Sequence, residues 1–382
     1  MKWIENLFDR LRPNFEGKDA RWASLYPLFE AAESFLFLSA KKTTGPPHAR
    51  DAVETKRYMS TVIVALLPPY LFGLLLFGPR LLLMTAVSYT LGGIVESLFA
   101  IFRKEEINEG FLVTGLIFPM VLPPGTPLWI VGMGIVFGVF FGKEVFGGTG
   151  HNVFNPALVG RCFVTLSWPA RLAQAYYQPG AWLDSLKTNG PWALWNPGPD
   201  AISSATPLAE VNEILQATGS SPTDLQTLWT YYTGVTSGCT GETCAVLILL
   251  CGAFLCWTRV ANWRTPFSIL VTYTVLAAIF SHPKLWGDVF AAPWVGLGTG
   301  SLLFGAFYMA TDPVSSPVSL SGKWIYGGCI GLLVLLFRGM GAVPEGVTYA
   351  ILMMNMFAPL IDRQIMQASV PKPLPSEEPS DE

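Results

Sequence analysis

The segment from Asp200 to Leu208, DAISSATPL, gathers three hydroxyl side chains in a run of small residues. Ser203, Ser204 and Thr206 each carry an oxygen that can donate and accept hydrogen bonds. Residues of these types are typical of turns on a protein surface. By residue type alone, the segment is therefore a polar loop, and a chemical role for it needs support from elsewhere in the chain.

A second candidate is the glycine-rich string FGGTGHNVFNPA, which spans residues 146–157. Its glycines permit a tight turn or the close approach of a ligand. Asn152 and Asn155 offer both donors and acceptors, which suit the polar edge of a flavin ring. Two interpretations remain open, a ligand-binding loop and a turn that serves only packing.

Glu96 lies inside the apolar string YTLGGIVESLFAIF. A carboxylate at membrane depth is costly, which makes it a candidate for function. Alternatively, because Arg103 is close in sequence, Glu96 lies near the membrane surface and snorkels or is capped. Gly92 and Gly93 precede it and leave room for a flat ligand or a neighbouring helix.

Other acidic residues and the cysteines carry weaker signals. The acidic groups at the ends of apolar segments either serve function, cap a helix or pair with a nearby Lys or Arg; they are Glu109, Glu144, Asp312, Glu345 and Asp362. The cysteine pairs CTGETC (239–244) and CGAFLC (251–256) lack the two-residue spacing of zinc or redox sites. Small residues packed in helices are the favoured interpretation, with a metal site as the alternative.

The composition indicates the elements that must position these residues. Hydrophobic residues make up 51% of the 382 residues and charged residues only 13%, whereas soluble domains average about a quarter charged residues. The net charge of −3 gives no reason to expect nucleic acid as a partner. The fold class predicted is an all-α polytopic membrane protein.

Ten segments are candidate membrane spans, since a span needs about 20 apolar residues, or fewer where a helix is broken. They are residues 59–78, 81–102, 110–123, 127–146, 153–169, 244–258, 266–281, 287–308, 324–337 and 346–361. The third is short and contains Pro119 and Pro123, so we expect a broken or re-entrant helix there. Such breaks survive only where the freed backbone groups face protein or a cavity.

The distribution of basic residues predicts the orientation. With the N-terminus inside, 19 of the 24 Lys and Arg residues fall in cytoplasmic segments and 5 in outer ones. The first 60 residues are polar and do not resemble a signal peptide. We therefore expect both termini in the cytoplasm and one long periplasmic loop at 170–243, with membrane spans at 59–169 and 244–361.

The ends of the chain carry their own expectations. In the cytoplasmic segment 1–58, Trp3, Ile4, Leu7, Phe8 and Leu11 recur at helical spacing. This spacing predicts an interfacial amphipathic helix, or alternatively a helix docked on a partner protein. Residues 362–382 end in an acidic, proline-rich stretch that predicts a disordered cytoplasmic tail.

Two strings hint at an internal repeat. NEGFLVTGLIFPMVLP (108–123) and PEGVTYAILMMNMFAP (344–359) share Glu-Gly and a proline fourteen residues after the glutamate. Transport folds often contain such repeats, although two short matches also arise by chance.

Several strings in order resemble one family along nearly the whole chain. They are RDAVETKR (50–57), INEGFLVTG (107–115), GKEVFGGTGHNVFNPALVGR (142–161), the Asp-x-x-Ser-x-Ala-Thr pattern at 200–206, MATDPVSS (309–316) and PEGVTYAILMMNMFAPLIDR (344–363). The chain resembles the family formed by the B-type subunits of Na⁺-translocating NADH:quinone oxidoreductases and the D-type subunits of Rnf complexes. The long polar N-terminal segment favours the B type. One departure is that Cys239 and Cys244 stand where the family usually has serine.

The resemblance implies two flavins. The hydroxyl of Thr206 would be esterified to the phosphate of FMN by a separate flavin transferase, with Asp200 and Ser203 at the other motif positions. Attachment through the phosphate leaves the isoalloxazine free for electron transfer. Asn152 and Asn155 would hold a riboflavin without a covalent bond.

The resemblance also implies an ion route and a quinone site. Gly92 and Gly93 would border the quinone, Glu96 would serve sodium uptake, and Asp312 and Asp362 would serve cation movement. The implied fold is similar to urea transporters, in a bacterial inner membrane. Electrons from NADH would enter through the other subunits (the A, C, D, E and F types), because this chain lacks a dinucleotide fingerprint. Alternative interpretations are an Rnf-type subunit and a flavin-free channel or permease.

Overall fold

The computed structural model describes residues 10, 12–15, 29, 55–103, 110–190, 206–218, 221, 224–281, 290–340 and 346–369. The regular elements within these residues are helices. Most of the expected N-terminal amphipathic helix lies outside them, apart from Arg10 and a 3₁₀ turn, η1 (Arg12–Asn14). Asp200, Ser203, Glu109 and Glu345 also lie outside the described residues.

The first half of the membrane region consists of five helices. They are α3 (Thr55–Phe77), α4 (Arg80–Arg103), α5 (Gly110–Met120), α6 (Leu128–Gly142) and α7 (Pro156–Ser167). Among the described residues, four helices are long and apolar enough to cross a membrane: Tyr58–Phe77, Arg80–Arg103, Leu128–Phe146 and, in the second half, Leu320–Met340. Shorter apolar helices fill the space between them.

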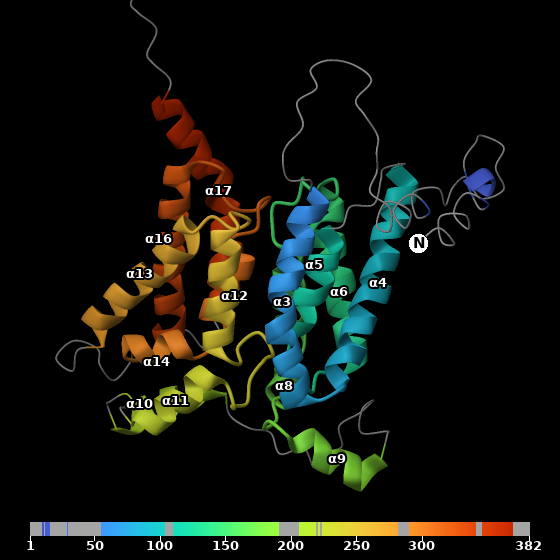
Figure 1. The fold of residues 1–382 in the computed structure, drawn as a ribbon. Helices are drawn as coiled ribbons and strands as arrows, with labels where there is room; N and C mark the ends of the chain where they lie inside the picture. Colours follow the sequence, from blue (N-terminus) through green and yellow to red (C-terminus); the bar gives the residue numbers. More distant parts are fainter. Residues whose placement is uncertain are drawn as a thin grey trace, which may run out of the picture.

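The second half repeats this plan with a broken third member. It contains α12 (Ala245–Trp257), α13 (Arg264–Phe280), α14 (Pro293–Gly298), α15 (Leu302–Phe304), the π-helix η5 (Gly305–Met309), α16 (Leu320–Met340) and α17 (Val347–Ser369). Figure 1 shows the two halves side by side, the first in blue to green and the second in yellow to red.

The eighth expected span, 287–308, is not one helix, and the prediction of a continuous helix there is wrong. α14 ends at Gly298, Thr299 is extended, and Gly300 has φ +66° before α15 begins. Glycine adopts that left-handed conformation without the steric cost that other residues have. In the first half, α5 is likewise short and ends at Met120, ahead of Pro123, as its prolines predicted.

The packing of the helices pairs the two halves in chain order. In each half the second helix packs on the fourth and the fourth on the fifth, while α3 meets α12 and α7 meets α17 across the middle. By this order α5 corresponds to α14–η5. The Glu-Gly strings instead lie at the start of α5 and just before α17, the third and fifth members, so they do not mark this repeat.

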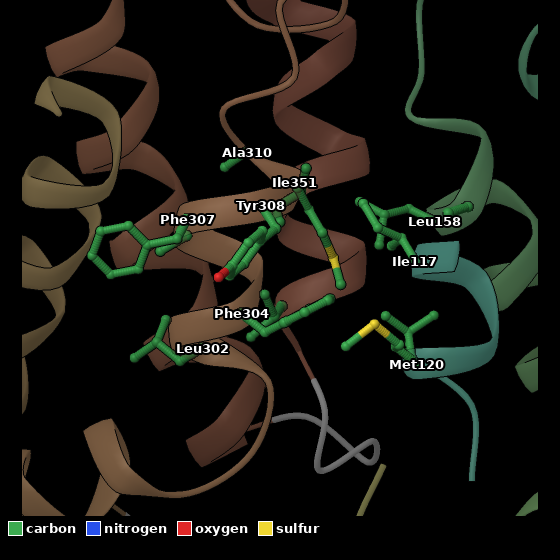
Figure 2. Close-up of a cluster of buried hydrophobic side chains, with 14 of the residues drawn as sticks. Ile117, Met120, Leu158, Leu302, Phe304, Phe307, Tyr308, Ala310 and Ile351 are labelled. Carbon is green, nitrogen blue, oxygen red and sulfur yellow. The ribbon is translucent and has the colours of Figure 1, made fainter. Parts of the chain in front are cut away.

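A dry cluster joins the halves at the centre. Figure 2 shows Ile117 and Met120 of α5 and Leu158 of α7 facing Phe304 and Ile351 of the second half. These five side chains are buried, with at most 5% of their surface exposed. The broken helices therefore meet in the hydrophobic core between the halves.

Close helix packing depends on glycine in both halves. A β-carbon at Gly138 of α6 would lie 2.5 Å from the carbonyl oxygen of Pro156, and one at Gly331 of α16 would lie 2.6 Å from that of Ile269. Small residues at such contacts let membrane helices approach backbone to backbone.

Four short helices cover one end of the bundle. They are α8 (Pro169–Ala173), α9 (Ala181–Asn189), α10 (Pro207–Thr218) and α11 (Leu225–Thr233). α9, α10 and α11 lie at the end opposite to where α3 begins and α17 ends (Figure 1). α17 continues to Ser369, so residues 362–369 are helical rather than disordered. The strong helix formers Gln364, Met366 and Gln367 extend it.

We expect Gly331→Ala to destabilise the protein, because the added methyl group meets the backbone of α13. Overpacking of this kind costs about 1–3 kcal/mol. Gly328→Ala, on the same helix, is the matched control, since its β-carbon would meet Thr272 Oγ1 at an ordinary 3.5 Å. Thermal unfolding in detergent measures both, and equal unfolding temperatures would contradict the account of the α13–α16 contact.

Candidate functional sites

Thr206 stands at the N-terminus of α10. Its carbonyl oxygen accepts a hydrogen bond from Glu210 N at 2.9 Å, and its Oγ1 accepts one from Ala209 N at 3.4 Å. Pro207 follows as the first helical residue, where the missing N–H is no loss. Thr206 is thus a helix cap rather than part of an open polar loop, and the Thr-Pro pair was the sequence signal for it.

Arg338 lies beneath the start of this helix. A β-carbon at Gly300 would come within 2.8 Å of Arg338 Nη2 and 3.2 Å of Leu208 Cδ2, so these groups share one site. The buried guanidinium donates to Gly296 O at 2.6 Å and to Thr299 O at 3.0 Å. It therefore ties α16 to the broken helix α14–α15 next to Thr206.

One cavity lies between the halves, near the end where α3 begins. Its volume is about 80 Å³. Its walls include Tyr58 of α3, Thr114 of α5 and Phe307 of η5. Asn152, Asn155, Lys143 and Asp312 also line it, so the structure brings both candidate asparagines to one cavity.

The two asparagines are held by local hydrogen bonds. Asn152 Nδ2 donates to Phe154 O at 3.0 Å, and Asn155 Oδ1 accepts from Ala157 N at 3.1 Å as the cap of α7. Neither bond uses the Oδ1 of Asn152 or the Nδ2 of Asn155, so an acceptor and a donor remain at the cavity. The glycines before them turn the chain, with φ +121° at Gly147 and +95° at Gly150.

Two buried ion pairs join α4 to the chain just after α6. Glu96 Oε1 lies 2.7 Å from Lys143 Nζ, and Arg103 Nη1 lies 3.0 Å from Glu144 Oε2. Only 5% of Glu96 is exposed, so this residue does not snorkel to the surface. Because Lys143 also lines the cavity, it connects Glu96 with the asparagines.

The glycine pair of α4 lies apart from this cavity. A β-carbon at Gly92 would lie 2.7 Å from the ring of Phe111 and 2.9 Å from Ile135, whereas one at Gly93 meets Phe111 only at 3.5 Å. Gly92 therefore serves the packing of α4 on α5 and α6, and Gly93 has room beside it. Neither is among the residues that line the cavity.

Asp312 and Asp362 hold the loop before α16. Asp312 accepts hydrogen bonds from Ser315 Oγ at 2.7 Å and Val314 N at 3.4 Å. Asp362 accepts from Val318 N at 2.7 Å and from both the backbone and the hydroxyl of Ser319. Both carboxylates therefore organise the loop, and only Asp312 reaches the cavity.

A buried cluster that the sequence did not predict lies around Arg161 of α7. Arg161 Nη2 is 3.5 Å from Glu242 Oε1, and both side chains are at most 6% exposed. Cys239 and Tyr176 lie beside them. Burial raises the pKa of the Cys239 thiol to about 12, so this cysteine is a neutral packing group. Charge counting had assigned Arg161 to the cytoplasmic surface, although an Arg inside an apolar run signals a buried partner.

Comparison with known proteins identifies the family. The sequence model of the NQR2, RnfD, RnfE family matches residues 42–370. The chain belongs to this family.

Named relatives of similar length share about a third of their residues with this family member. The B-type subunit of the Na(+)-translocating NADH-quinone reductase of Azotobacter vinelandii is 36% identical and that of Pseudomonas aeruginosa (strain UCBPP-PA14) is 35% identical, each alignment covering 97% of this chain and 98% of the relative. The equivalent protein of Yersinia pestis is 32% identical, over 96% and 98%. The similarity extends over the whole architecture described above.

We expect Arg161→Met to destabilise this family member strongly, because it leaves the Glu242 carboxylate buried without its cation. Breaking a buried pair costs about 3–5 kcal/mol, whereas replacing both members is often neutral. The double variant Arg161→Met/Glu242→Gln should therefore regain part of the loss. Arg171→Met, at an exposed arginine of α8, is the control. Unchanged thermal unfolding in Arg161→Met would refute the pairing.

Proposed function

We propose that this chain is the membrane-embedded B-type subunit of a Na⁺-translocating NADH:quinone oxidoreductase, passing electrons over a covalent FMN and a riboflavin to quinone while Na⁺ crosses the membrane. The observation that carries the proposal is that Thr206, in the sequence pattern of covalent flavin attachment, caps a helix. Relatives with the name of this type of protein match almost the full chain.

The site of Thr206 fits a phosphoester. The N–H groups of the first turn of α10 and the positive end of its dipole favour an anion at Thr206. The Arg338 guanidinium lies below the same turn and adds a second positive charge. FMN bound there would supply one-electron and two-electron redox chemistry, with its ring left free. A separate flavin transferase would attach it, reading the Asp200 and Ser203 motif positions.

The cavity fits the polar edge of a flavin ring. The free Oδ1 of Asn152 and Nδ2 of Asn155 would accept from and donate to such an edge, and the apolar walls from α5 and η5 would flank the ring. Riboflavin is the flavin that the proposal assigns to this site, because the residues that line the cavity include one lysine but no arginine to hold a phosphate.

Glu96, Asp312 and Asp362 form the proposed ion route, and Gly92 and Gly93 the proposed quinone border. Carboxylate oxygens can replace part of the hydration shell of a hard cation such as Na⁺. Glu96 and Asp312 approach the cavity from opposite halves, and Asp362 holds the loop that carries Asp312. The open side of Gly93, rather than the packed Gly92, would face the quinone.

The proposed setting is a bacterial inner membrane, with both termini in the cytoplasm and Thr206 on the periplasmic side. The position of α10 at the end opposite to the start of α3 supports this orientation (Figure 1). The remaining subunits of the oxidoreductase would oxidise NADH and contact this chain.

We predict that Thr206→Ala abolishes covalent flavin, while Thr230→Ala, at a threonine on α11 of the same region, leaves it intact. Peptide mapping by mass spectrometry of chain co-expressed with its flavin transferase gives the site directly. An unmodified Thr206 in the wild type, or covalent flavin retained in Thr206→Ala, would overturn the assignment.

We predict that Gly93→Ala raises the quinone KM several-fold, with flavin content and thermal stability near those of the wild type. The added methyl group has internal space, so its effect reports on a ligand. Gly92→Ala is the contrasting variant, because its methyl group meets Phe111 and should lower stability. Quinone kinetics and inhibitor binding that do not change in Gly93→Ala would place the pocket elsewhere.

A further inference from the structure

We infer that Lys143 is an internal cation that competes with Na⁺ for Glu96, and that it links this carboxylate to charge in the asparagine cavity. The inference rests on the proposed function, in which Glu96 serves the ion route and the cavity holds a flavin. Lys143 is a positioning residue in this account. Its part is to occupy or vacate the carboxylate, and it need not touch the transported ion.

The first observation is that the carboxylate of Glu96 is only half satisfied. Oε1 contacts Lys143 Nζ at 2.7 Å, whereas Oε2 is buried and has no hydrogen-bond partner among the described residues. A buried oxygen without a partner is costly. A small cation that displaced the ammonium would contact both oxygens and remove that cost.

The second observation is the position of Lys143 between two polar sites. Its side chain is only 4% exposed, it pairs with Glu96 of α4, and it lines the cavity with Asn152, Asn155 and Asp312. The neighbouring Glu144 is already paired with Arg103. Glu96 and the cavity are therefore the two places toward which the flexible lysine stem can direct its charge.

These contacts imply an exchange of cations. While the cavity is uncharged, the ammonium neutralises Glu96 and excludes Na⁺. When negative charge accumulates in the cavity as electrons arrive from NADH, the ammonium is drawn toward it and Glu96 becomes available to Na⁺. The attraction is strong at such short range, because a buried site screens charge far less than water does.

The test is Na⁺-dependent thermal stabilisation of the purified complex, with choline keeping the ionic strength constant and flavin content measured on every sample. Glu96→Gln defines the part of the response that belongs to this carboxylate. Lys143→Met should lower the Na⁺ concentration for half of that response by about tenfold or more, since close charge pairs couple by at least about 1.5 kcal/mol. Lys143→Arg should raise it, because the guanidinium binds a carboxylate through two hydrogen bonds.

Reduction by dithionite adds the second arm. It should lower the half-saturating Na⁺ concentration of the wild type, and it should have no such effect in Lys143→Met. If Lys143→Met does not fold, Lys143→Arg decides alone.

Three outcomes would overturn the inference. A Na⁺ response that Glu96→Gln abolishes but that both lysine variants leave unchanged refutes the role of Lys143 and spares the proposed function. A Lys143→Met response that still shifts on reduction refutes the link to the cavity. A Na⁺ response that Glu96→Gln does not alter removes Glu96 itself from the ion route, and the proposed function then fails at that point.

Discussion

The structure depends on satisfying the backbone where two membrane helices break inside the protein. Backbone groups without partners are too costly to leave within a bilayer. In the first half, Arg80 donates to the carbonyls of Pro124 and Thr126, at 3.1 and 2.8 Å, beyond the end of α5. In the second half, Arg338 donates to those of Gly296 and Thr299. Two buried guanidinium groups thus make the broken helices possible.

The broken helices in turn determine where chemistry can occur. Because α5 and α14–η5 stop short, loops and side chains from both halves reach the interior at each end of the bundle. At one end the Asn152–Asn155 cavity forms beside the Glu96–Lys143 pair. At the other, Arg338 lies below Thr206 and the α10 helix. The same constraint therefore accounts for the fold and for the separation of the two candidate flavin sites.

Much of the architecture was predictable from the sequence, because membrane helices leave long apolar runs. The short α5 followed from Pro119 and Pro123, and the cap at Thr206 was available in the Thr-Pro pair. The break at 299–301 was not predicted, since glycine and small residues also fit a continuous membrane helix. Arg161, Lys143 and Arg338 were counted as loop charges. Their partners Glu242, Glu96 and the Thr299 carbonyl are distant in sequence, so only the folded chain brings them together.

The central claim is that this chain carries two flavins, one attached covalently and one held in the cavity. Acid precipitation of the purified chain, followed by flavin fluorescence of the pellet and the supernatant, tests it most directly. The account predicts FMN fluorescence that stays with the polypeptide and riboflavin that is released. A chain without flavin in either fraction, purified after expression with its flavin transferase, would contradict the account and favour a flavin-free channel.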